Sequence, residues 1–201
     1  GARMMTLTWN HENELASPQR NPGGVLVPQT EKGLTGKGFE FLAEMERMHM
    51  IVDVSHLSDK GFWDIVEHGT RPFAASHSNC RALAPHTRNL TDEMIRALSE
   101  RGGIAGLNYY APFLDTDPTH PENCRSTVEL IAKHAAHYKQ VGGAQMIALG
   151  SDFDGIDGPH QLENAAFLPL LADALRKEDF TEDEVEGIYY RNAMRFFEEN
   201  L

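Results

Sequence analysis

The chain has 201 residues, of which 41% are hydrophobic, and its formal net charge is −12. This length and composition suit one globular domain with a sizeable core and argue against wholesale disorder. The acidic charge disfavours nucleic acid as a partner, and no stretch reaches the ~18 to 20 apolar residues of a membrane span. Cys80 and Cys124 are too few for a disulfide scaffold, and no secretory signal is visible, so we expect a cytoplasmic location.

Five short strand-like runs alternate with longer helical patterns along the chain. Strands are predicted at 4–9, 51–54, 72–76, 104–110 and 146–149. Helices are predicted at 36–48, 59–68, 91–101, 126–141, 162–176 and 181–197, and a polar loop at 10–35. Strands that alternate with helices in this way predict right-handed βαβ units and an α/β fold with a parallel sheet.

Polar side chains fall where the predicted strands end. His56, His77, Asn108 and Asp152 stand at or near the carboxyl ends, which is the edge where parallel α/β folds bind ligands. Two imidazoles together with carboxylates suit zinc or a similar divalent ion. Asp152 could bind such a metal or accept a proton from metal-bound water. Each of these residues could instead be an ordinary polar residue at a strand end or turn.

Arg88 and the remaining histidines are less informative from position alone. The Arg88 guanidinium could hold a carboxylate in a bidentate pair, or it could be a solvated loop side chain. His134 and His137 lie three residues apart on one predicted helix, and we expect them on a solvated face. His86 lies in a loop, where a ligand role is not expected.

Four stretches follow the predicted strands and their loops: Ile51 to Ser58, Ala75 to Ser78, Arg88 to Leu90 and Gly150 to Gly155. Together they resemble the membrane (renal-type) dipeptidase family of the amidohydrolase superfamily, and the segment 192–196 is similar to the closing helix of that family. Their order and approximate spacing match, so the resemblance extends over essentially the whole chain. It implies a TIM-type (β/α)8 barrel with a two-zinc centre that hydrolyses dipeptides.

The resemblance also implies a role for individual residues. His56 and His77 match the two histidines that bind the second zinc, and Arg88 matches the arginine that contacts the substrate carboxylate. Asp152 matches the aspartate of the eighth strand, which shuttles a proton and meets the amine end of the substrate. Asn108 and Tyr109 would lie in the substrate-binding wall.

Two departures from the family pattern matter. The family's first-strand His-x-Asp pair and its bridging glutamate have no counterpart, so the ligands of the first zinc site are absent. We therefore expect residues 1–201 to form the C-terminal portion of one barrel domain, with about its last five strands. The N-terminal half would come from another chain, or would have been cleaved or left out. Trp9 stands where some members have a histidine after Leu-Thr, and His11 could substitute for it.

The leading hypothesis is a zinc-dependent dipeptidase that acts through a metal-activated water. Its expected partners are a dipeptide substrate and the missing N-terminal half or another chain, and a homo-oligomer is possible. One alternative is a catalytically incomplete fragment that acts as an assembly partner. Another is an amidohydrolase for a different small amide or lactam, because the substrate-selecting loops cannot be decoded from one sequence.

Overall fold

A five-stranded parallel sheet forms the centre of the fold. The computed structural model describes residues 1–19, 27–115, 120–158 and 160–201. Neighbouring strands are parallel and lie side by side in chain order. They are β1 (Met4–Thr6), β2 (Ile51–Asp53), β3 (Ala74–Ala75), β4 (Ile104–Asn108) and β5 (Ile147–Ser151). The predicted parallel α/β architecture is confirmed, although most strands are shorter than predicted.

Eight α-helices occur in the described part of the chain. They are α1 (Gly36–Arg47), α2 (Asp59–His68), α3 (Asp92–Glu100), α4 (Ala111–Leu114), α5 (Val128–Gly142), α6 (Leu168–Lys177), α7 (Glu182–Glu186) and α8 (Asn192–Asn200). Side chains cap several of them: Ser58 accepts a hydrogen bond from the backbone of α2, and Thr91 accepts one from α3. The last predicted helix is divided, because a π-helical segment, Gly187–Arg191, joins α7 to α8.

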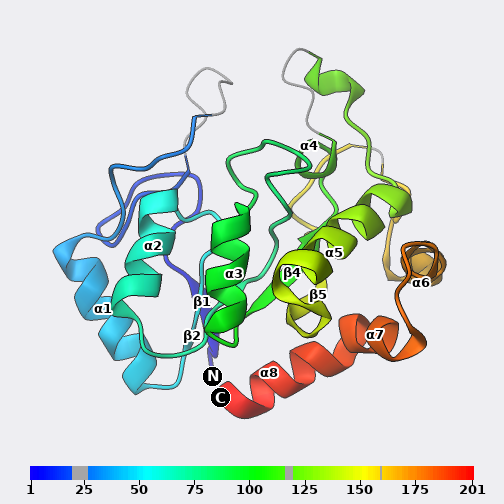
Figure 1. Ribbon diagram of the computed structural model, residues 1–201. Helices are drawn as coiled ribbons and strands as arrows, with labels where there is room; N and C mark the ends of the chain where they lie inside the picture. Colours follow the sequence, from blue (N-terminus) through cyan, green and yellow to red (C-terminus); the bar gives the residue numbers. More distant parts are fainter. Residues whose placement is uncertain (20–26, 116–119, 159) are drawn as a thin grey trace.

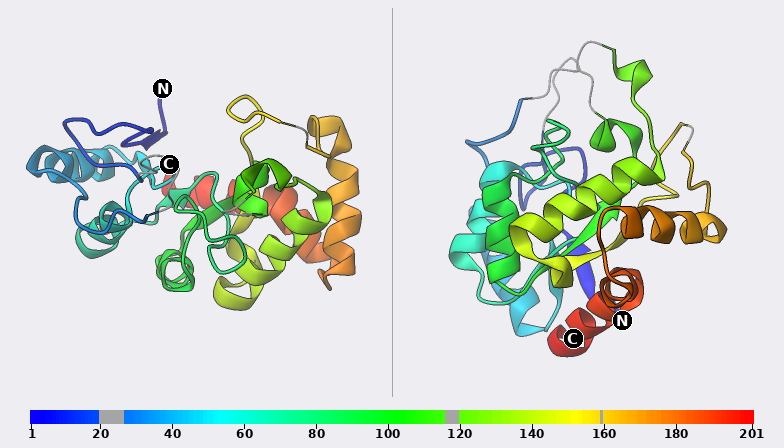
Figure 2. Two further views of the ribbon diagram at one scale, coloured as in Figure 1. Left: turned by 90° about the horizontal axis from the view of Figure 1, so that it is seen from above. Right: turned by 45° about the vertical axis from the view of Figure 1, so that its right-hand side comes forward.

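The helices and the sheet form layers (Figure 1). Helices α1, α2, α3 and α5 lie along one face of the sheet, and the view from above shows them on the outside of a curved arrangement (Figure 2). The main core fills the space between sheet and helices, where strand residues such as Val52, Ala105 and Ile147 pack with Leu98 and Ile131. Each buried valine, leucine or isoleucine of this core contributes about 1.5–3 kcal/mol.

The opposite face of the sheet is apolar at one end and polar at the other. Near the amino ends of the strands, Ile51, Ala74, Ile104 and Ala148 cluster around Phe196 of α8. Asp53 and Asn108 share this face, because alternate residues of a strand point to the same side. Helix α8 therefore covers this face near the amino ends of the strands, and the polar residues lie near the carboxyl ends.

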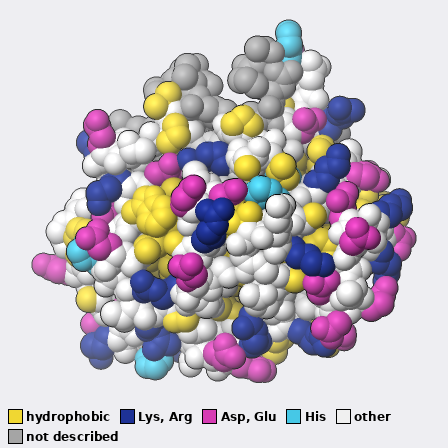
Figure 3. All heavy atoms as spheres, in the orientation of Figure 1, with side chains coloured by type: hydrophobic (Ala, Val, Ile, Leu, Met, Phe, Trp, Pro, Cys, Tyr) yellow, Lys and Arg dark blue, Asp and Glu magenta, His cyan; other side chains and the backbone are white. Residues whose placement is uncertain are grey.

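The surface carries charges of both signs. On the face seen in Figure 3, acidic and basic side chains are interspersed and form no block of one sign. In the described part of the chain, no helix combines the length and apolar character that crossing a bilayer requires.

Candidate active site

Two imidazole rings face each other at the carboxyl edge of the sheet. His56 follows β2 and His77 follows β3, and their Nε2 atoms lie 3.0 Å apart. His56 has a backbone φ of 73°, and Asp152 has one of 70°. This left-handed region costs a residue other than glycine about 1–3 kcal/mol, and such strain clusters at functional sites. The structure thus brings the two predicted metal ligands together and strains the backbone at two of the predicted site residues.

The outer nitrogen of each ring is held by a hydrogen-bond acceptor. His77 Nδ1 lies 2.7 Å from Ser76 Oγ, which in turn lies 2.6 Å from Asp53 Oδ2. A carboxylate only accepts, so the Ser76 hydroxyl donates to Asp53 and accepts from His77 Nδ1–H. His56 Nδ1 lies 3.0 Å from the side-chain oxygen of Asn10, which also accepts. Both rings therefore carry their proton on Nδ1 and present an Nε2 lone pair.

The surroundings keep both rings neutral. Burial, followed by the charge of Arg88 and the neighbouring ring, lowers the pKa of His56 to about 2. Burial and Arg88 also lower the pKa of His77, against the opposing effect of Asp53 and Asp152. Neutral imidazole is the form that binds metal ions, and two lone pairs at this distance repel unless they share a cation.

A divalent ion fits this pair of nitrogens. The 3.0 Å separation is compatible with two bonds of ~2.0–2.1 Å to one zinc ion. The held Nδ1 protons are the arrangement that orients metal-binding histidines in proteins. Among the described residues, however, no group of three or more His, Cys, Asp or Glu side chains is placed to hold a metal. The described residues thus provide two nitrogen ligands, fewer than the three or four of usual zinc sites.

Asp53 is a site residue that the sequence interpretation missed. It is only 3% exposed and accepts hydrogen bonds from Thr6 Oγ1, the Ser55 backbone, and both the backbone and hydroxyl of Ser76. The sequence held one signal for it: Asp53 is the acidic residue of an otherwise apolar strand. Its carboxylate fixes the position of Ser76 and, through Ser76, the orientation of His77.

Asp152 is aimed into the site by Asn108. Asp152 follows β5, and the buried Asn108 side chain donates from Nδ2 to Asp152 Oδ2 over 3.0 Å. A side chain at Gly155 would displace this carboxylate, because a Cβ at that position would lie 2.3 Å from Asp152 Oδ1. Asp154, two residues away, is exposed. The carboxylate of Asp152 is therefore positioned, whereas that of Asp154 faces solvent.

One pocket of about 360 Å³ is lined by His56, Asp152 and Arg88 together. Its lining consists of Trp9, Asn10, His56, His86, Arg88, Tyr110, Phe113, Asp152, Gly155 and Ile156. Arg88 Nε and Nη2 are buried and have no hydrogen-bond partner in the described chain. Burial lowers the pKa of Arg88 to about 10, so the guanidinium stays charged at neutral pH. A buried cation with unpaired donors is costly, and an anion such as a carboxylate would satisfy it.

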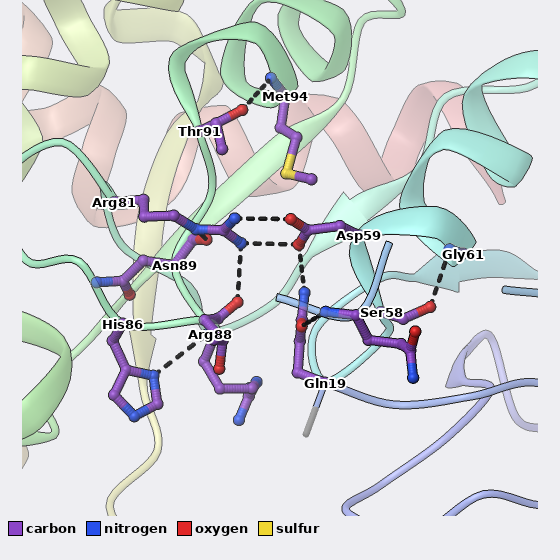
Figure 4. A network of polar contacts seen from close by, with 12 residues as sticks. Gln19, Ser58, Asp59, Gly61, Arg81, His86, Arg88, Asn89, Thr91 and Met94 are labelled. Atoms are coloured by element: carbon purple, nitrogen blue, oxygen red, sulfur yellow. Dashed lines mark hydrogen bonds and ion pairs between the residues drawn. The ribbon is translucent and has the colours of Figure 1, made fainter. Parts of the chain in front are cut away.

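A polar network holds the loop that carries Arg88 (Figure 4). Arg81 donates to both carboxylate oxygens of Asp59, over 2.7 and 2.8 Å. The same guanidinium donates to the backbone oxygens of Thr87 and Asn89, the two neighbours of Arg88. Gln19 donates to Asp59 as well. The chain is thus clamped immediately before and after Arg88.

Three of the predicted substrate-binding residues, Asn108, Tyr109 and His11, do not line this pocket, and Asn108 instead supports Asp152. Tyr109 is fully buried in the main core, with its ring 5.5 Å from that of Phe153, and the next residue, Tyr110, lines the pocket. The prediction for Tyr109 is corrected accordingly, because its side chain points to the helix-covered face. His11 is exposed beside Trp9 and does not line the pocket; Trp9 does, with its ring 6.4 Å from that of His56.

Comparisons with known proteins find relatives that match nearly the whole chain. A family model described as membrane dipeptidase (peptidase family M19) matches residues 1–200. The chain is 36% identical over 197 residues to an uncharacterized protein in the pqqA 5′ region of Klebsiella pneumoniae, covering 97% of this chain and 71% of that protein. It is 34% identical to an uncharacterized dipeptidase of Schizosaccharomyces pombe, covering 97% of this chain and 46% of that protein.

A solved structure shares the fold. It is a metallo peptidase from Rhodobacter sphaeroides liganded with a phosphinate mimic of the dipeptide L-Ala-D-Ala. The TM-score is 0.90 at 31% identity, over 100% of this chain and 56% of that chain. The chain thus spans about half the length of this structure and of the Schizosaccharomyces pombe relative.

Proposed function

The chain belongs to the membrane dipeptidase family, peptidase family M19, and from this premise we propose that it takes part in the zinc-dependent hydrolysis of dipeptides. One observation carries the proposal. Two facing imidazole nitrogens, a positioned carboxylate and a buried unpaired guanidinium come together at one edge of the sheet. These are the groups needed to hold a metal ion, move a proton and bind the carboxylate of a peptide.

His56 and His77 would hold the metal through their Nε2 atoms. When bound, zinc supplies Lewis-acid chemistry and lowers the pKa of a bound water toward neutrality. The Nδ1 contacts to Asn10 and Ser76 keep both Nε2 atoms unprotonated and aimed at one point. The two rings thus need no deprotonation before they bind the ion.

Asp152 would act as the proton-transfer group. Its Oδ2 accepts a hydrogen bond from Asn108, which fixes the carboxylate at the wall of the pocket that His56 also lines. A carboxylate held at this point can accept a proton from the attacking water and pass it to the leaving amine. It can also pair with the amine end of a dipeptide.

Arg88 would bind the other end of the substrate. A dipeptide ends in a carboxylate, and Arg88 offers Nε and Nη2 as two unpaired donors in the fork that suits bidentate pairing. Placing the carboxylate there and the amine near Asp152 would leave the peptide bond between them, toward His56. The pocket volume of about 360 Å³ is within the range of small-molecule sites.

We further propose that another polypeptide segment completes the metal centre. The two histidines fall short of the usual three or four zinc ligands, and β1 and β5 are the edges of the described sheet. A segment that pairs along one of these edges, in the same polypeptide or in another, could supply the remaining ligands and the second zinc site. The alternative functions, an assembly partner without activity and an amidohydrolase for another amide or lactam, remain outcomes of the test.

The test compares two neighbouring carboxylates in the zinc-loaded protein. Asp152→Asn should abolish hydrolysis of a dipeptide such as L-Ala-D-Ala and leave the zinc content near normal. Asp154→Asn is the matched control, because its exposed side chain lies outside the pocket lining, and it should keep near-normal turnover. Undiminished turnover in Asp152→Asn would refute the assigned role. A fully zinc-loaded wild type that cleaves no dipeptide would favour one of the two alternatives. Cleavage of a lactam by that protein would then favour the amidohydrolase for another substrate over the assembly partner.

A further inference from the structure

His86 lines the same pocket as Arg88 and Asp152, yet the proposed reaction gives it no role. Its side chain is almost buried, at 9% exposure, and its ring centroid lies 4.5 Å from that of Phe113. A histidine in such a place is either a structural support or a group that meets the ligand. The protonation of its two nitrogens distinguishes these roles.

The backbone determines which nitrogen of His86 carries the proton. The Arg88 N–H donates to His86 Nδ1 over 3.1 Å. A backbone amide can only donate, so Nδ1 presents its lone pair and the proton of the neutral ring is on Nε2. Burial, followed by the charges of Arg88 and Arg81, lowers the pKa of His86 to about 4, which keeps the ring neutral at physiological pH. The Nε2–H has no acceptor in the described part of the chain.

The free donor of His86 and the guanidinium of Arg88 lie on one wall. Figure 4 shows the imidazole and the Arg88 side chain extending to the same side of the loop. The Phe113 ring contacts both, since Arg88 Cζ lies 5.2 Å from its centroid. The clamp made by Arg81 and Asp59 holds the backbone that carries them. Two donors with fixed positions therefore border the same space.

We propose that His86 Nε2–H is a second donor to the terminal carboxylate of the substrate, beside the Arg88 guanidinium. This inference rests on the proposed function, and it adds a residue that selects for the carboxylate form of the substrate. A carboxylate offers about four lone-pair sites, so it can accept from Arg88 and His86 together. His86 adds this hydrogen bond without placing a second positive charge near the metal ligands. A substrate that ends in an amide has an NH2 group in place of one acceptor oxygen and no charge for Arg88.

The test measures binding separately from turnover. The dissociation constants of a dipeptide and of its C-terminal amide are measured by calorimetry on the zinc-loaded protein, for wild type and His86→Phe. Because hydrogen bonds to charged groups are the strong ones, His86→Phe should weaken binding of the dipeptide by roughly tenfold or more. Binding of the amide should change by less than about twofold, and kcat for the dipeptide should change little. His86→Gln, which retains a donor, should recover part of the loss.

Two results would overturn the inference. Equal weakening of dipeptide and amide in His86→Phe would make the ring a structural support only, and an unchanged dissociation constant of the dipeptide would remove it from carboxylate recognition. Where His86→Phe does not fold, NMR of the wild type decides: the Nε2 resonance should shift when dipeptide is added, and an unmoved resonance refutes the contact. Binding of the dipeptide without cleavage would count against the proposed reaction. The His86 contact would still be judged by the ratio of the dissociation constants of dipeptide and amide.

Discussion

The substitution Asp53→Asn tests how His77 is prepared for metal binding. Asp53 Oδ1 accepts from the backbone of Ser55 and Ser76, so the amide oxygen of an asparagine will take that place. The new NH2 group then faces the Ser76 hydroxyl and donates to it. Ser76 must turn its own proton toward His77 Nδ1, which moves the proton of His77 to Nε2. The nitrogen that faces His56 would no longer be a metal ligand.

The expected loss of zinc affinity can be taken from other hydrogen bonds that orient metal-binding histidines. Loss of the group that orients a metal-binding histidine usually weakens metal affinity by about 10- to 100-fold. That range corresponds to about 1.4–2.7 kcal/mol of binding free energy. Asp53→Asn should therefore weaken zinc binding by this amount, measured by calorimetry, while the NMR spectrum of His77 shows its proton on Nε2.

Thr6→Val provides the matched control. Thr6 Oγ1 donates to the same carboxylate over 2.8 Å but makes no hydrogen bond with Ser76 or His77. This variant should keep zinc affinity within about twofold of the wild type. Unchanged zinc affinity in Asp53→Asn would refute the reasoning, as would a His77 proton that stays on Nδ1. Equal weakening by Thr6→Val would show that the effect is a general disturbance of the strand.

Two further predictions concern stability in the metal-free chain. Arg81→Met leaves the carboxylate of Asp59, about 10% exposed, without its cation, and it should lower the free energy of unfolding in urea by about 3 kcal/mol. Arg47→Met, which removes an exposed pair with Glu44, should leave the urea midpoint nearly unchanged, and equal effects of the two would contradict the structure. Burial lowers the pKa of His134 to about 4, so the unfolded chain takes up this proton first as the pH falls below about 6.5. Stability should fall by about 2 kcal/mol from this histidine between pH 6.5 and about pH 5. His134→Gln should make the urea midpoint less dependent on pH in that range, and an unaltered dependence would be evidence against the shift.

Local sequence patterns were enough to predict the layout of the sheet and the edge where the site lies. The alternation of strands and helices determined the parallel order, and hydroxyl side chains before α2 and α3 marked where these helices begin. Because parallel strands end at one edge, His56 and His77 could be predicted to meet from their positions alone. These features depend on short-range periodicity, which a single sequence records.

The same periodicity accounts for two residues whose side chains lie elsewhere than predicted, Tyr109 and His134. Asn108 and Tyr110 share one face of β4 and its extension, so alternation places Tyr110 at the pocket and sends Tyr109 into the core. His134 falls on the helical stripe of Ile131 and Tyr138, and it is buried at 1% exposure rather than solvated. It accepts from the Cys80 backbone and donates to the Leu114 oxygen, which explains how a polar ring is tolerated there.

Other features depend on contacts between distant residues. The hydrogen-bond chain from Asp53 through Ser76 to His77 joins two strands, and the clamp on Arg88 joins α2 to a loop 22 residues further along. No local pattern encodes such long-range geometry, so these parts of the site required the three-dimensional structure.

We propose above that His56 and His77 bind one metal ion through their Nε2 atoms. Anomalous diffraction at the zinc edge, from crystals grown with zinc, tests it most directly. We expect a peak about 2.0–2.1 Å from both nitrogens, on the pocket side that Asp152 and Arg88 line. Zinc-soaked crystals in which the two rings keep their positions and no anomalous peak lies between them would contradict it.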